Sequence, residues 1–202
     1  MREDEKPWQP MSVAAIAELL QDADFPWWIA GGYALELAIG KNYRAHGGID
    51  VLILRPDHTR VRQYLQHWDC WAADPPGTLR FWPAGESLKP YVHDIWCRQN
   101  PADTWRWQIM IDETDERGWC SRRNPDVSMS FEDMTRTTQQ GVPYLAPHVQ
   151  LYYKALRRRA KDERDFDEVL ASGVQLDRDW LIDVIRTNYG PDHPWLDRLE
   201  AV

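Results

Sequence analysis

The chain has 202 residues, of which 43% are hydrophobic and 28% are charged, a balance that is typical of a folded globular protein and argues against disorder. Its formal net charge of −8 argues against DNA or RNA as the main partner, because binding to a phosphate backbone requires a basic surface. An acidic protein suits a cationic small-molecule ligand better.

The sequence gives no sign of a membrane or secretory protein. No stretch approaches the roughly 20 apolar residues of a membrane span, and the acidic start lacks the apolar run of a signal peptide. The three cysteines, Cys70, Cys97 and Cys120, are widely spaced and odd in number, which indicates buried or free thiols in a reducing compartment. We therefore expect a cytoplasmic protein with no membrane partner.

The chain carries twelve tryptophans, several-fold more than usual. Most are expected to fill the core and the contact between lobes, where large aromatic side chains bury the most surface. The alternative is that a few of them line a pocket and stack on a base or a sugar ring.

Helices and strands are predicted to alternate through the first part of the chain. Ser12 can cap a helix in which apolar residues recur at helical spacing, and short apolar runs between breakers predict strands. The predicted helices are 12–22, 33–39 and 58–67, and the predicted strands are 27–30, 49–54, 79–82, 91–97 and 105–111.

The pattern changes from about Phe131, where the spacing predicts helices at 146–159, 162–170 and 177–188. We therefore predict an α/β domain over residues 1–125 and a helical domain over residues 126–202, with a seam near residues 120–130.

A glycine pair stands between the first predicted strand and the helix that follows it. Gly31 and Gly32 would let backbone amides approach an anion, and the helix N-terminus adds partial positive charge. The pair therefore predicts a cradle for a triphosphate. The alternative is that the turn needs glycine for its backbone geometry alone.

Several ordered motifs resemble the aminoglycoside 2''-adenylyltransferase-like and lincosamide nucleotidyltransferase family. The motifs are Trp28 to Leu37 with Gly40, Arg44-x-His46-x-x-Ile49-Asp50, His93 to Cys97, Gly141 to Pro147, Leu151 to Ala155, and Lys161 to Phe166. They cover nearly the whole chain. The resemblance implies a nucleotidyltransferase (DNA polymerase β-like) fold of the α/β (α+β) class, with a mixed sheet and a C-terminal helical lobe.

The resemblance also implies site residues. Asp50 and Asp94 would be the catalytic carboxylates and the magnesium ligands, and Asp94 would also take the proton of the acceptor hydroxyl. The nucleotide phosphates would contact Gly31, Gly32, Arg44, His46 and Lys154. Roles outside catalysis and binding stay open for three of these residues. Asp94 would be a structural cap, His46 would only fix its loop, and Lys154 would be a solvated helix residue.

Position 48 departs from the family pattern, which has an aspartate two residues before Asp50. Carboxylates two apart on a strand share one face, so both can bind metal. This chain has Gly48 there, while Arg44, His46 and Ile49 keep their register. A metal site built for two cations thus lacks one ligand, and the sequence leaves open whether the change is engineered or natural.

We expect a magnesium-dependent enzyme that moves a nucleoside monophosphate, AMP in the resembling enzymes, from ATP or another NTP to a hydroxyl of a small molecule such as an aminoglycoside-type antibiotic. Gly48 should make it slow or inactive. Two alternatives stay open, namely a nucleotide-binding module without transfer activity and a toxin-type nucleotidyltransferase that modifies protein or tRNA.

An acidic run follows the predicted strand 105–111. Asp112, Glu113, Asp115 and Glu116 are expected either to form a rim that attracts a polycationic acceptor or simply to be solvated in a turn.

Overall fold

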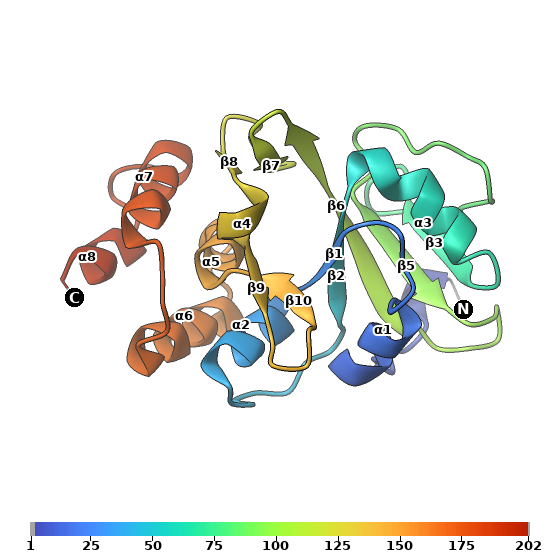
Figure 1. Ribbon diagram of the computed structural model, residues 1–202, viewed down its shortest axis with the longest axis horizontal. Coiled ribbons are helices and arrows are strands. Elements are labelled where there is room, and N and C mark those ends of the chain that lie inside the picture. Colours follow the sequence, from blue (N-terminus) through green and yellow to red (C-terminus); the bar gives the residue numbers. More distant parts are fainter. Residues whose placement is uncertain (1–2, 202) are drawn as a thin grey trace.

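The structure is a computed structural model that describes residues 3–201, and it consists of a mixed sheet with helices on both faces (Figure 1). The strands are β1 (Trp27–Ala30), β2 (Asp50–Leu54), β3 (Asp69–Ala73), β4 (Leu79–Phe81), β5 (Asp94–Arg98), β6 (Trp107–Asp115), β7 (Gly118–Cys120), β8 (Ser128–Met129), β9 (Thr135–Thr137) and β10 (Pro143–Leu145). The α-helices are α1 (Val13–Leu19), α2 (Gly31–Ile39), α3 (His58–Tyr64), α4 (Phe131–Met134), α5 (Pro147–Ala155), α6 (Ala160–Ser172), α7 (Arg178–Tyr189) and α8 (Trp195–Glu200). Short 3-10 helices lie at Glu3–Glu5 and Arg55–Asp57.

The strands follow the order β4-β3-β5-β6-β2-β1-β10-β9, and β7 pairs with the end of β6. Two neighbouring pairs, β2 with β6 and β1 with β10, are parallel, whereas β1 and β2 are antiparallel. Helices α1 and α3 lie on one side of the sheet, and α2, α5 and α6 lie on the other (Figure 1). The mixed sheet confirms the predicted fold class.

The turn from β1 into α2 forms as the local sequence predicts. Strand β1 has the predicted bounds, and α2 begins at Gly31, slightly before the predicted start. It ends at Gly40, whose left-handed φ of 73° closes the helix with a hydrogen bond to the Glu36 carbonyl. Ser12 caps α1 by accepting a hydrogen bond from the Ala15 N–H at 3.1 Å.

The middle of the sheet differs from the prediction at several points, one of which is that β5 begins at Asp94 instead of Tyr91. Strand β3 was not predicted, because its polar Asp69 obscures the apolar pattern; in the structure that carboxylate pairs with the buried Arg98 at 2.6 Å. Strand β6 continues to Asp115 instead of ending at Ile111. Three of the four acids, Asp112, Glu113 and Asp115, therefore belong to a paired strand, and Glu116 lies in the turn that follows it.

The sheet also continues beyond residue 125. Strand β10 pairs with β1, and β9 pairs with β10, so residues 135–145 complete the sheet. The mainly helical part begins at α5, and α8 joins the predicted helices there. The division at residue 125 into two domains stays a prediction.

Tryptophans lie both in the core and in the lining of a cleft, and whether the latter stack on a base or a sugar ring stays a prediction. Trp82, Trp105, Trp107, Trp119 and Trp195 are among the most completely buried side chains. Others line a cleft, described below. Within residues 3–201, no helix has the length and apolar character needed to cross a membrane.

A fully buried carboxylate, Asp165 on α6, ties the helical part to the rest of the fold. It accepts two hydrogen bonds from the Arg44 guanidinium, at 2.6 and 2.8 Å, and a third from the Tyr43 hydroxyl at 2.9 Å. The Lys154 ammonium on α5 lies 2.7 Å away. Burial alone would raise the pKa of Asp165, but its hydrogen bond from Arg44 and the charge of Lys154 bring that pKa below the ordinary value of 3.8.

Replacing Asp165 by alanine should lower the free energy of unfolding by about 3–5 kcal/mol, because the change leaves Arg44 without its carboxylate partner and leaves the buried Lys154 with Asp162 alone. Urea denaturation at pH 7 measures this loss. Because the pKa of Asp165 is lowered by folding, its contribution is complete above pH 4 or so and is lost as the pH falls further. The difference between variant and parent should therefore shrink in acid.

Asp167→Ala serves as the matched control, since Asp167 lies on the same helix and forms an exposed ion pair with Arg198. Exposed pairs contribute little to stability. Equal losses in the two variants would show that Asp165 is not a special anchor.

Candidate active site

A cleft with a volume of about 360 Å³ opens between the sheet and helices α2, α5 and α6. It brings together most of the residues that the sequence singled out: Gly31, Gly32, Arg44, His46, Gly48, Asp50 and Lys154. These residues come from the α2 N-terminus, the segment before β2, the first residue of β2, and α5.

The floor of the cleft is a row of side chains across three strands. Trp96 on β5 is in register with Gln108 on β6, which is in register with Asp50 on β2. Residues in register share a face of the sheet, so all three point into the cleft. Asp94 is in register with Met110, two residues beyond Gln108 and hence on the same face.

Asp94 is thus separated from Asp50 by one strand. Its Oδ1 accepts a hydrogen bond from the Gln108 amide at 2.9 Å. Burial raises the pKa of Asp50, and the negative charge of Asp94 raises it further, against the lowering effect of Lys154. The two carboxylates therefore repel each other across the cleft floor.

Glycine is required at both positions of the pair because side chains press against them. A Cβ on Gly31 would lie 2.3 Å from Asp50 Oδ2, and Gly31 has a left-handed φ of 67°. A Cβ on Gly32 would lie 2.1 Å from an Arg44 nitrogen and 2.4 Å from His46 Cε1. Neither glycine merely shapes a turn, because the cleft side chains occupy the space that a larger residue would need.

A side chain of the protein already binds one of the groups that were predicted to contact the phosphates, the N–H of Gly31. The N–H of Gly31 donates a hydrogen bond to Gln150 Oε1 on α5 at 2.7 Å, and this bond is buried. The amide of Gly31 is therefore already satisfied within the protein. A phosphate at the first turn of α2 would meet the amide of Gly32 instead.

Arg44 and His46 form a fixed pair at the cleft wall. Arg44 donates to His46 Nδ1 at 3.0 Å, so Nδ1 is the acceptor and the ring proton lies on Nε2, which is 3.0 Å from Glu36 Oε1. The His46 ring stacks on Tyr33 with centroids 4.1 Å apart. Because Asp165 also holds the Arg44 guanidinium, Arg44 and His46 help to fix the conformation of the segment before β2. This is the structural role that the sequence left open for His46.

The cleft is lined by far more positive than negative charge. Asp50 is the one carboxylate among the lining residues, which include six cations: Arg44, Arg122, Arg123, Lys154, Arg159 and Lys161. Arg44, Lys154 and Arg159 share two carboxylates behind the wall, Asp162 and Asp165. Burial and the charges of Arg159 and Lys154 lower the pKa of Lys161, as expected where positive charge is in excess.

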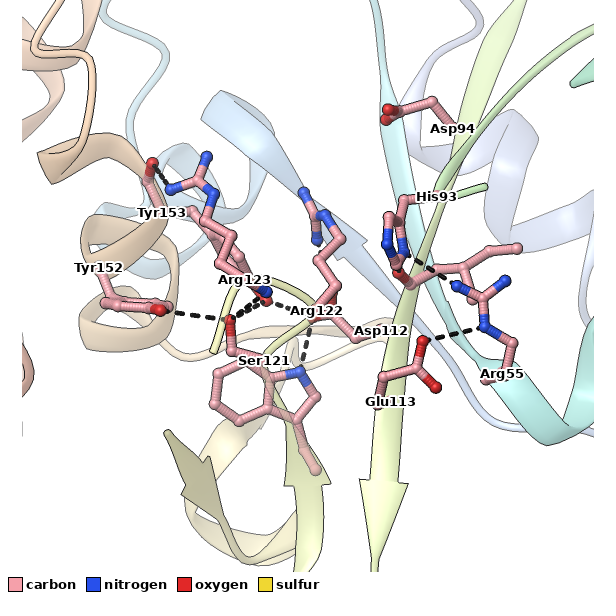
Figure 2. A network of polar contacts seen from close by, with 12 residues as sticks. Arg55, His93, Asp94, Asp112, Glu113, Ser121, Arg122, Arg123, Tyr152 and Tyr153 are labelled. Atoms are coloured by element: carbon pink, nitrogen blue, oxygen red, sulfur yellow. Dashed lines mark hydrogen bonds and ion pairs between the residues drawn. The ribbon is translucent and has the colours of Figure 1, made fainter. Parts of the chain in front are cut away.

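The predicted acidic rim is wrong. Asp112 is fully buried and accepts hydrogen bonds from Arg122, Trp119 and Tyr153 at 2.6, 2.6 and 2.7 Å (Figure 2). Glu113 pairs with Arg55 at 2.9 Å. The remaining two acids are exposed around the β6–β7 hairpin, where Asp115 pairs with its neighbour Arg117, and none of the four lines the cleft.

Asp112 instead positions a cation. Its contact holds the Arg122 guanidinium against the Tyr153 ring, 4.4 Å from the ring centroid, and Figure 2 shows Arg122 between α5 and β6. The negative charges of Asp112 and of the more distant Asp94 outweigh burial and raise the pKa of Arg122. Arg123, beside it, donates to the carbonyl of Tyr153 at 2.7 Å.

Two carboxylates on this face of the sheet, Asp50 and Asp94, could take part in holding a magnesium ion. Oxygen ligands suit magnesium, which proteins usually hold through one or two carboxylates together with substrate phosphates. In the part of the chain that the structure describes, no group of three or more His, Cys, Asp or Glu side chains is placed to hold a metal ion.

Position 48 itself has room for a side chain. A Cβ on Gly48 would meet only ring atoms of Trp8, at 3.6 Å, which is an ordinary van der Waals distance. Lack of space therefore does not explain why position 48 has no carboxylate.

Sequence reasoning missed the residues that reach the cleft through tertiary structure. They are Trp8, Trp96, Gln108, Met110, Arg122, Arg123, Gln150, Tyr153, Arg159 and Lys161. The adjacent arginines after β7 were a visible signal, but only the contact with Asp112 shows which way Arg122 points.

Comparison with known proteins gives a family match and a set of distant structural neighbours. The model of the family described as Aminoglycoside-2''-adenylyltransferase matches residues 12–168. A search of curated proteins found no match.

Three solved structures illustrate the neighbours. The antibiotic-resistance factor ANT(2'')-Ia has a TM-score of 0.54 at 12% identity, covering 88% of this chain and 90% of that one. The lincosamide antibiotic adenylyltransferase LnuA with bound lincomycin has a TM-score of 0.52 at 15% identity, covering 79% and 95%. An antigenic nucleotidyltransferase-like protein from Paracoccidioides brasiliensis has a TM-score of 0.50 at 15% identity, covering 94% and 90%. At these identities the neighbours show that the fold is that of nucleotidyltransferases.

Gly31→Ala should weaken ATP binding at least tenfold, because the new methyl group must displace the Asp50 carboxylate. Gly40→Ala is the matched control: Gly40 ends the same helix with a similar positive φ, and a Cβ there meets nothing within 4 Å. Both variants should lose about 1–2 kcal/mol of stability from the left-handed backbone, but only Gly31→Ala should lose binding. Calorimetric titration of both with ATP tests this; equal affinities would contradict the close-approach role.

Proposed function

Because the chain belongs to the aminoglycoside-2''-adenylyltransferase family, we propose that it transfers a nucleoside monophosphate, AMP in the first instance, from a nucleoside triphosphate to a hydroxyl group of a small, antibiotic-type molecule. The observation that carries this proposal is the meeting of six cationic side chains with the Asp50 carboxylate in one cleft, while Asp94 lies on the same face of the sheet one strand away. The cations suit a triphosphate, and the carboxylates suit the reacting centre.

The triphosphate would lie along the wall formed by α2, α5 and α6. There the amide of Gly32 and the side chains of Lys154, Arg159 and Lys161 provide donors for phosphate oxygens. Most of these groups are fixed before any ligand arrives, since Lys154 and Arg159 are held by Asp162. Such a preorganised set stabilises the charge that develops on the leaving pyrophosphate.

The reaction would proceed by in-line attack of the acceptor oxygen on the α-phosphorus. The new bond joins that oxygen to phosphorus, the bond to the bridging oxygen breaks, and pyrophosphate leaves. Asp94 would accept the hydroxyl proton, and Gln108 holds its carboxylate in place through the 2.9 Å hydrogen bond. Asp50 and Asp94 would hold one magnesium ion, which when bound supplies Lewis-acid stabilisation of the phosphate charge.

A second candidate function is nucleotide binding without transfer. Gly48 favours it, because the family position of a carboxylate is empty while the phosphate-binding wall keeps its cations. Only transfer forms products, namely pyrophosphate and the modified acceptor.

Incubation with ATP, magnesium and a panel of aminoglycosides and lincosamides should therefore yield pyrophosphate and an adenylylated acceptor, measured by a coupled phosphate assay and mass spectrometry. Asp50→Asn should remove this activity without lowering the thermal midpoint, since it replaces a half-buried carboxylate whose pKa is raised. ATP binding without pyrophosphate release, for every acceptor, would favour the second candidate.

Gly48→Asp should raise the transfer rate at least tenfold and tighten manganese binding, because it returns a carboxylate beside Asp50. Gly47→Asp is the matched control, as it adds the same charge one residue away, where a Cβ meets nothing within 4 Å. Manganese affinity read by electron paramagnetic resonance separates the two variants. If both respond alike, added charge and not a ligand position explains the effect.

A further inference from the structure

We infer that Arg122 binds the α-phosphate of the nucleotide, and that Asp112 is the positioning residue that holds Arg122 in place for this contact. The inference rests on the proposed function, which puts a nucleoside triphosphate in the cleft. Arg122 comes from the segment after β7, so it is separate from the phosphate-binding wall of α2, α5 and α6. It therefore reaches the nucleotide from a different direction than the cations of that wall.

The carboxylate of Asp112 is oriented so that one of its oxygens is left for Arg122. Its Oδ2 accepts hydrogen bonds from the Trp119 indole at 2.6 Å and from the Tyr153 hydroxyl at 2.7 Å. Its Oδ1 accepts the Arg122 Nη1–H at 2.6 Å. Because Asp112 is fully buried, solvent screens this charge-assisted contact little.

The Arg122 guanidinium is bound on one side and open on the other. The Tyr153 ring supports it, with the guanidinium carbon 4.4 Å from the ring centroid. Its Nη1 binds Asp112, whereas its Nε and Nη2 have no hydrogen-bond partner among residues 3–201. The side chain is only 10% exposed and lines the cleft, so these two nitrogens are available to a ligand there.

Arg122 is held close to the carboxylates of the cleft floor. Gln108, Met110 and Asp112 alternate along β6 and share the cleft face of the sheet. Met110 is in register with Asp94, which makes Asp112 a diagonal neighbour of Asp94, about 7–8 Å away and within reach of a long side chain. Figure 2 shows Arg122 extending between helix α5 and Asp94. Burial would lower the pKa of Arg122, but the charges of Asp112 and Asp94 raise it.

This position suits the phosphoryl group that is transferred. In the proposed reaction Asp94 accepts the proton of the acceptor hydroxyl, so the α-phosphorus lies beside Asp94 while negative charge builds on its oxygens. The Nε–Nη2 edge of a guanidinium carries two parallel N–H groups that match two phosphate oxygens. Lysines on α5 and α6 remain for the β- and γ-phosphates. Gly48 removes a possible metal ligand, whereas the charge of Arg122 is permanent.

AMP and ATP distinguish a contact with the α-phosphate from contacts with the other two phosphates. Both would be titrated calorimetrically into the full chain without magnesium, so that the protein's own cations provide the binding. Arg122→Gln should weaken both nucleotides about tenfold, because both carry the phosphate that Arg122 binds. Arg122→Lys should weaken both by a smaller factor, because an ammonium keeps the charge but not the two parallel donors. Lys161→Gln should weaken ATP much more than AMP.

Asp112→Asn tests the positioning role, and Glu113→Gln is its matched control. Both acids lie on β6 and pair with an arginine, but Glu113 points to the opposite face and pairs with Arg55 outside the cleft. Asp112→Asn should weaken AMP about fivefold in the parent protein and have no further effect when Arg122→Gln is already present. Glu113→Gln should leave both nucleotide affinities unchanged.

Thermal midpoints show whether each variant folds. If Asp112→Asn does not fold, Tyr153→Phe takes its place, since it removes one hydrogen bond to Asp112 and keeps the ring under Arg122. Tyr153→Phe should then weaken AMP binding by a smaller factor, again only while Arg122 is present.

Unchanged AMP affinity in Arg122→Gln overturns the α-phosphate contact, and so does a parent protein that binds neither nucleotide. A loss from Asp112→Asn that is equal with and without Arg122 shows a purely structural role and overturns the positioning. If AMP and ATP respond as expected but no acceptor releases pyrophosphate from ATP, the phosphate contact stands and the proposed transfer reaction fails.

Discussion

The fold depends on one buried carboxylate, Asp165, and on the cations gathered around it. Arg44 reaches it from the segment before β2 and Lys154 reaches it from α5, so an early segment of the chain and two consecutive helices near its end meet at one charge. Because a buried charge is costly without partners, this contact leaves little freedom in how the helices sit on the sheet. Arg44 then positions His46, and both press against Gly32, so the shape of the cleft follows from the ion pair.

The contrast between the whole surface and the cleft is the main electrostatic feature. A chain with a net charge of −8 gathers six cations around a single lining carboxylate. Net charge therefore describes solubility and long-range attraction, whereas the ligand meets the local field. The two contributions have opposite signs here, which is why composition suggested a cationic ligand and the geometry suggests an anionic one.

Local features were predictable and long-range ones were not. The β1–Gly31–α2 turn follows from strand-breaking and helix-breaking residues within a few positions, and Asp50 was implied by the resemblance to the family. Asp112 was misread because an acid in a charged run looks solvated, while its partners Trp119 and Tyr153 come from other elements. The pairing of β10 with β1 joins segments more than a hundred residues apart, and no periodicity reports such a contact.

That pairing has a consequence for synthesis on the ribosome. Strand β1, with its apolar Trp-Trp-Ile-Ala sequence, is made early, but the neighbour on one of its edges is β10, made after about two thirds of the chain. An unpaired apolar edge invites association with other chains. The nascent protein must therefore keep this edge protected, or fold late, until Tyr144 and then the Gln150 side chain that satisfies the Gly31 amide have emerged.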